Sequence, residues 1–130
     1  MTTAKPMMGS TPSLNEPHWL TMARTNLVRI APEDVPAPGD GSLWLSDVMK
    51  AAGQKGLADS ATALDWRKYG KAVDTKAMMP SVGSIAIVKT AAGHHVGLLA
   101  RQTTGSLFVM GEGVLRAFPR TAAVEFRYPL

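Results

Sequence analysis

Two adjacent histidines, His94 and His95, and an acidic residue further along, Glu112, are the residues best suited to chemistry. A histidine can act as a general base near neutral pH, and a carboxylate can orient its ring. The chain has no cysteine, which excludes thiol nucleophiles, disulfides and thiolate metal sites. A two-histidine metal site is not expected either, because adjacent residues of a strand point to opposite faces. Catalysis by His95 would therefore need a nucleophile other than a thiol.

Three amphipathic segments that precede the histidines are predicted to be helices. They cover residues 17–27, Ser42–Ala52 and Ser60–Tyr69. Ser42 and Ser60 are the expected N-caps, and Gly53 and Gly70 lie just past the C-terminal ends. The segment Ala31–Gly41 carries three prolines and two glycines, so it is predicted to be a loop.

After Pro80 the chain changes to short runs rich in β-branched and aromatic residues, which are typical of strands. The predicted strands are Ser84–Thr90, His95–Arg101, Ser106–Met110, Val114–Phe118 and Val124–Tyr128. The links between them are too short for crossover helices, so neighbouring strands are expected to pair antiparallel as a meander or small barrel. His94 is expected to lie in a turn. Helices followed by strands indicate an α+β fold.

The length of 130 residues fits one compact domain. Residues 1–16 mix Thr, Ser, Pro, Gly and Met without a period, and we predict an extended arm there that engages a protein partner in a larger assembly. Residues 17–130 are expected to form the single domain. The sequence has neither a signal-peptide pattern nor an apolar run of membrane-spanning length, so we expect no membrane span. The expected location is a virion or, failing that, the cytoplasm.

The charge balance is mildly basic, with 14 Lys and Arg against 10 Asp and Glu and a formal net charge of +4. Such a balance favours polyanions such as nucleic acid or acidic wall polymers without choosing between them. The basic residues are scattered along the sequence rather than gathered in a run, so nucleic-acid binding ranks last among the hypotheses. No cofactor and no metal site are predicted.

Three motifs carry a resemblance to a known family. They are Trp44-Leu45-Ser46, Gly93-His94-His95-Val96-Gly97-Leu98 and Val109-Met110-Gly111-Glu112-Gly113. Together they resemble the NlpC and CHAP superfamily of papain-like peptidoglycan hydrolases, in particular its small phage-associated members. The likeness extends over roughly residues 17–129 and includes a Pro-x-x-Gly-x-Ile turn at 80–85. It implies a papain-like fold, with N-terminal helices followed by an antiparallel sheet.

The resemblance also implies a role for each matching residue. In the family a cysteine at the start of a helix attacks an amide carbonyl as a thiolate, and Leu45 occupies that position here. His95 matches the general base. Glu112 is the candidate for the polar residue that orients this base, although a shift of one residue would put Gly113 there. Leucine has no lone pair with which to attack, so the resemblance implies an inactive domain.

The leading hypothesis is a catalytically inactive peptidoglycan-hydrolase-like domain, used as a structural or binding module in a phage tail or virion, with peptidoglycan as a candidate ligand. The alternative is an active cell-wall hydrolase with a non-cysteine nucleophile and His95 as base. Ser46 is one such nucleophile, but its side chain is expected about 100° around the helix from Leu45. Trp19, Trp44 and Trp66 could form a sugar-stacking platform, yet the last two are expected in the core.

Overall fold

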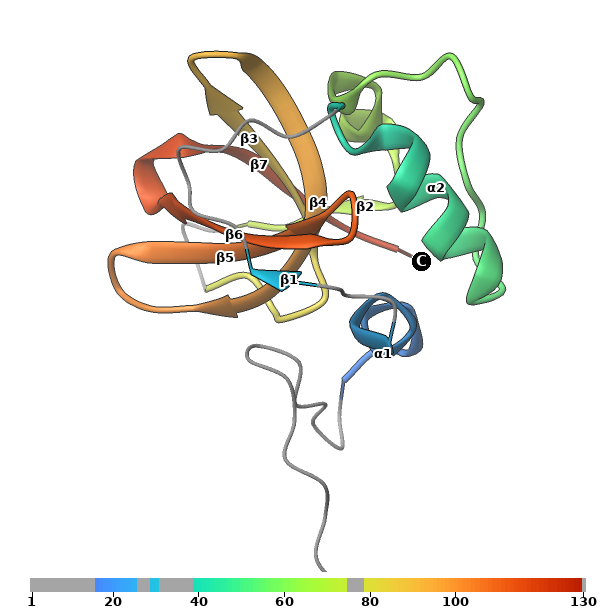
Figure 1. Ribbon diagram of the computed structural model, residues 1–130, viewed down its shortest axis with the longest axis horizontal. Coiled ribbons are helices and arrows are strands. Elements are labelled where there is room, and N and C mark those ends of the chain that lie inside the picture. The colour runs from blue at the N-terminus through green and yellow to red at the C-terminus, as the bar shows by residue number, and fades with distance from the viewer. Residues whose placement is uncertain (1–15, 26–28, 31–38, 75–78, 130) are drawn as a thin grey trace, which may run out of the picture.

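The computed structural model describes residues 16–25, 29–30, 39–74 and 79–129, which form an α+β fold. In chain order the elements are α1 (His18–Thr25), β1 (Arg29–Ile30), α2 (Ser42–Ala51), η1 (Ala63–Lys68), β2 (Lys71–Ala72), β3 (Ile85–Thr90), β4 (Gly93–Gln102), β5 (Ser106–Gly111), β6 (Val114–Pro119), η2 (Arg120–Ala122) and β7 (Ala123–Tyr128), where η denotes a 3-10 helix. The strands form one curved sheet, with α1 and α2 on the same side of it (Figure 1).

The sheet has the strand order β1-β6-β5-β4-β3-β7-β2. Strands β3 to β6 follow one another as an antiparallel meander, which confirms the predicted pairing of these four neighbours. The last strand, β7, was expected beside its neighbour β6, but it pairs antiparallel with β3 instead. Two further pairings were not predicted: β1 runs parallel to β6, and β2 pairs with β7. Strands of two residues are too short to leave a periodic signal in the sequence.

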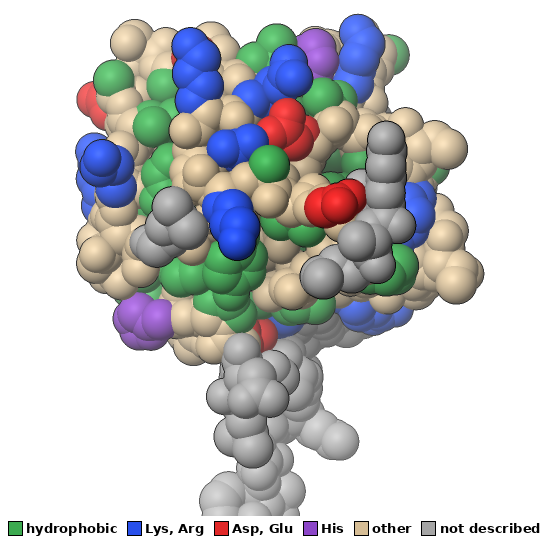
Figure 2. All heavy atoms as spheres, turned by 180° about the vertical axis from the view of Figure 1, so that it is seen from behind, with side chains coloured by type: hydrophobic (Ala, Val, Ile, Leu, Met, Phe, Trp, Pro, Cys, Tyr) green, Lys and Arg blue, Asp and Glu red, His purple; other side chains and the backbone are tan. Residues whose placement is uncertain are grey.

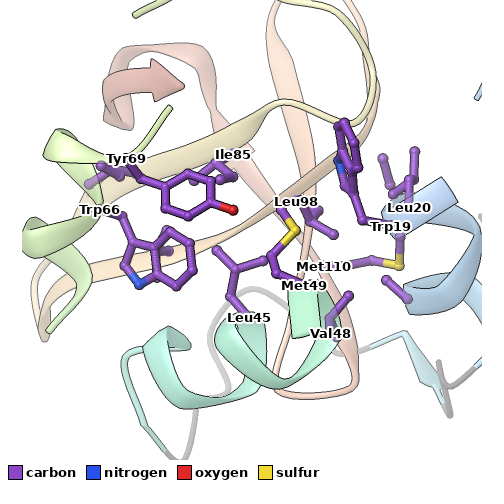
Figure 3. Packing of buried hydrophobic residues seen from close by; sticks show 14 of the residues in the cluster. Trp19, Leu20, Leu45, Val48, Met49, Trp66, Tyr69, Ile85, Leu98 and Met110 are labelled. Atoms are coloured by element: carbon purple, nitrogen blue, oxygen red, sulfur yellow. The ribbon is translucent and has the colours of Figure 1, made fainter. Parts of the chain in front are cut away.

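The sheet packs on both of its faces. The larger core lies between the sheet and the helices, and its fully buried members include Leu20, Leu45, Met49, Trp66 and Leu98 (Figure 3). The opposite face carries a smaller core, which consists of Ala86, Leu99, Leu107, Val109 and Phe126. Because successive residues of a strand point to opposite faces, Leu98 and Leu99 of β4 belong to different cores.

Helix α2 begins one residue earlier than a cap at Ser42 would place it. Gly41 is the N-cap, in the left-handed conformation with φ 88°, and Ser42 is the first helical residue. The predicted cap at Ser42 is therefore wrong. Gly53 follows the C-terminal end with φ 83°, where the absence of a Cβ removes the steric penalty, as predicted.

The third predicted helix is shorter than expected and is the 3-10 helix η1. Its N-cap is Thr62, not Ser60, because the carboxylate of Asp65 accepts a hydrogen bond from the Thr62 backbone N–H and closes a capping box. Gly70 follows the helix with φ 57°, which agrees with the predicted C-terminal glycine.

Glu16, the last residue of the predicted arm, is bonded to α1. The Glu16 carboxylate accepts hydrogen bonds from Arg24 and Thr21 of α1, both at 2.8 Å, and only 1% of its side chain is exposed. Arg24 also donates to the carbonyl of Ala100 in β4, which fastens α1 to the sheet. Residues 1–15 of the predicted arm and Leu27, at the end of the first predicted helix, lie outside the described residues.

Candidate functional site

Leu45, which the resemblance predicts at the nucleophile position, is completely buried. It is the fourth residue of α2, and its side chain points into the larger core, which also contains Leu98 and Trp66 (Figure 3). No solvent reaches its side chain, which has 0% exposure. An unreactive aliphatic group therefore occupies position 45, inside the core.

The neighbouring hydroxyl of Ser46 is used for structure. Ser46 is 1% exposed, and its Oγ both donates to the carbonyl of Leu57 and accepts from the backbone N–H of Leu57, each at 2.9 Å. A Cβ on Gly56 would lie 2.3 Å from this Oγ, so the loop needs glycine to approach so closely. The Ser46 hydroxyl thus holds the loop after α2 and faces away from solvent.

The segment Gly39–Ser42, which we call the α2 junction, is where the candidate site residues meet. Asp40 organises it: its carbonyl accepts from the N–H of Val96 in β4 at 2.8 Å. Its carboxylate accepts from the N–H of Ser42 at 3.0 Å and from that of Ala63 in η1 at 2.8 Å. One aspartate therefore ties the start of α2 to β4 and to η1.

Gly41 allows the α2 junction to lie directly against β4. Its φ of 88° is one that L residues rarely adopt, and a Cβ at this position would lie 2.0 Å from the carbonyl oxygen of Val96. Conformation and close approach both require glycine here. The backbone of the junction is thus fixed in the plane of the sheet beside the first residues of β4.

His95 and Glu112, the two predicted site residues, both bind the main chain of the α2 junction. His95 Nδ1 lies 3.2 Å from the carbonyl oxygen of Gly39, and since a carbonyl only accepts, this hydrogen bond requires a proton on Nδ1. The Glu112 carboxylate accepts from the N–H of Gly41 at 3.1 Å. Among the described residues Glu112 is the non-glycine residue with a positive φ, 56°. Gly113, the alternative match, has no side chain with which to orient a base.

The strand pattern places His95 and Leu45 on different faces of the sheet. Val96 and Leu98 belong to the core that contains Leu45, so alternation along β4 directs His95 to the opposite face. A general base must come within hydrogen-bond reach of the group it deprotonates. His94 lies within β4, opposite Lys89 of β3, so the turn predicted for it is wrong.

The tryptophans form no common platform. Trp66 is fully buried and donates its indole N–H to the Ser42 hydroxyl at 2.9 Å. Trp19 is 9% exposed and donates to the carbonyl of Gly83 at 2.8 Å. Trp44 packs against the same core and stays partly exposed. Two of the three rings are therefore closed to a sugar ligand.

In the part of the chain that the structure describes, no group of three His, Cys, Asp or Glu residues could hold a metal ion.

A second polar cluster lies where η1 meets β7, and sequence reasoning missed it because its members are far apart in the chain. Glu125 accepts from Arg67 at 3.0 Å and from Arg127 at 2.7 Å. Burial acts to raise the pKa of Glu125, but the hydrogen bonds and charges of the two arginines outweigh it and hold this pKa below its ordinary value. Burial raises the pKa of the nearby Tyr69 phenol.

Comparison with known proteins leaves the family open: no protein-family model matches the chain, and no curated protein matches it. None of the helices in the described ranges is long and apolar enough to cross a membrane.

The chemistry available at the α2 junction is hydrogen bonding through His95, Glu112 and Asp40, all of which are engaged with backbone groups.

Proposed function

We propose that the chain is a catalytically inactive relative of the NlpC and CHAP hydrolases, with a papain-like arrangement of helix and sheet, that serves as a binding or structural module at the bacterial cell wall. A phage tail or virion is the assembly in which we place it. The proposal is supported by the order of the three motifs and by the helix-then-sheet architecture.

The burial of Leu45 is the observation that carries the proposal. A dead enzyme that keeps its fold has no further use for a reactive group at the start of α2, and an apolar side chain there adds to the core instead. Complete burial of a leucine side chain contributes roughly 1.5–3 kcal/mol. His95 and Glu112 both fasten the α2 junction, and His95 lies on the face of the sheet opposite Leu45, an arrangement that suits an inactive domain.

The face beside the α2 junction is where we place the contact with peptidoglycan. Leu43 and Leu64, the second residues of α2 and η1, are 50% and 39% exposed. Their two elements are joined at the junction by the bonds of Asp40 and by the Trp66–Ser42 hydrogen bond. Exposed apolar groups beside a rigid backbone are suited to contact the sugar and peptide surface of the wall.

Sedimentation with purified sacculi, stripped of all covalently attached polymers, tests this proposal. The wild-type protein should sediment with them, and Leu43→Asp should weaken this binding. Val124→Asp is the matched control, because Val124 is 42% exposed but lies on β7. Equal loss in both variants, or no sedimentation of the wild type, would argue against the proposed face.

A further inference from the structure

Five basic residues from distant parts of the sequence lie on η1, β2 and β7 or are bonded to them through the main chain. This set, which we call the basic corner, consists of Lys55, Arg67, Lys68, Lys71 and Arg127. Tyr69 assembles it: its hydroxyl donates to the carbonyl of Lys55, and its own carbonyl accepts from Arg127 at 2.7 Å. Arg127 also donates to the carbonyl of Gly70, and Lys71 lies opposite Tyr128 in the β2–β7 pair.

The charge of the basic corner is only partly neutralised. Glu125 accepts from Arg67 and Arg127, yet 56% of the Arg67 side chain remains exposed. Within the described residues, no ion pair engages Lys68 or Lys71, and both are exposed. The Asp65 carboxylate, in the first turn of η1, accepts a hydrogen bond from the backbone N–H of Thr62.

The residues of the basic corner carry a net positive charge. Its five basic residues and Glu125 sum to +4, and Asp65 of η1 lowers this sum to +3. Figure 2 shows basic side chains over much of one face, many of them in its upper half, with acidic groups among them.

We infer that the basic corner is a second binding surface, separate from the α2 junction, for the phosphodiester backbone of an anionic wall polymer. A flexible polyanion suits this surface because exposed lysines bind phosphates as point charges and release condensed counterions. The choice of a wall polymer over other polyanions rests on the proposed function. The two surfaces would let the domain bind the glycan and its attached polymer together.

Binding of poly(glycerol phosphate) by two charge-matched variants tests the inference. Lys68→Gln with Lys71→Gln removes two charges from the basic corner, and Lys89→Gln with Arg101→Gln removes two exposed charges from β3 and β4. Both double variants have a formal charge of +2, which is +4 less two. Only the corner variant should weaken binding, and it should reduce the slope of log affinity against log salt by about 1.4–1.8.

Each outcome of this experiment decides for or against the basic corner. Equal weakening in the two double variants would show that net charge alone drives binding, and it would overturn the inference. The inference would also be overturned if the wild-type protein did not bind poly(glycerol phosphate). The same holds if it bound a single-stranded oligonucleotide with the same number of phosphates more tightly than poly(glycerol phosphate). Sedimentation with stripped sacculi does not involve this polymer, so failure here leaves the proposed face at the α2 junction to be judged separately.

Discussion

A thiol introduced at position 45 should not act as a nucleophile. The chain has no cysteine, so Leu45→Cys introduces a single thiol whose reactivity can be measured without background. Its side chain would lie in the larger core, where Leu45 is 0% exposed. Burial raises the pKa of a thiol, because the apolar surroundings disfavour the thiolate. Leu43→Cys is the control, two residues earlier on the same helix at a position that is 50% exposed.

The expected difference in reactivity follows from the opening that a buried thiol requires. A small domain has a free energy of unfolding of about 5–15 kcal/mol, and truncating a buried leucine removes at most about 2–5 kcal/mol of it. If about 3 kcal/mol still opposes exposure of Cys at position 45, the thiol is accessible for roughly one part in 150 of the time. Its reaction should then be at least about 100-fold slower than that of the control.

The assay is the rate of modification by an aromatic disulfide reagent, followed by absorbance with and without denaturant. In denaturant the two variants should react at the same rate, which controls for the reagent. Under native conditions Leu45→Cys should be slow and Leu43→Cys fast. Similar native rates would refute the reasoning, because they would mean that position 45 faces solvent or a groove.

Two further predictions concern stability. Gly41→Ala places a Cβ 2.0 Å from the Val96 carbonyl oxygen, at a φ of 88°. Denaturant titration should therefore show that the free energy of unfolding falls by more than about 2 kcal/mol. Gly105→Ala is the control, because a Cβ there meets nothing within 4 Å, and it should change this free energy by under about 0.5 kcal/mol. Because the pKa of Glu125 is lowered in the folded state, its contribution is present at neutral pH and is lost as the pH falls below about 4.5. Glu125→Gln should therefore lose less stability than the wild type on acidification; parallel stability curves would contradict this.

The strands and the second helix could be predicted from the sequence because their signals are local. Alternating β-branched runs and short glycine turns identified β3, β5, β6 and β7 to within a residue or two, and α2 followed from its apolar stripe. The cap of η1 was misplaced because Ser60 and Thr62 are both good cap residues, and only the Asp65 side chain decides between them. His94 was assigned to a turn although β4 extends back to Gly93.

The candidate site could be predicted only as a set of residues. The motifs identified Leu45, His95 and Glu112, but the partners of the last two are Gly39 and Gly41, more than fifty residues earlier in the chain. A contact of that separation depends on the tertiary fold and leaves no local pattern. The cluster around Glu125 and the basic corner could not be predicted for the same reason, because their residues are far apart in the sequence.

The most direct test of the central claim is the release of soluble fragments from peptidoglycan by the purified wild-type protein. New amino groups and reducing ends are measured in the supernatant over many hours, with a known wall hydrolase as positive control and His95→Ala as comparison. A buried Leu45 and a histidine engaged with the α2 junction predict no release above buffer for either protein. Release by the wild type that His95→Ala abolishes would contradict the account and would establish an active hydrolase with a nucleophile other than a thiol.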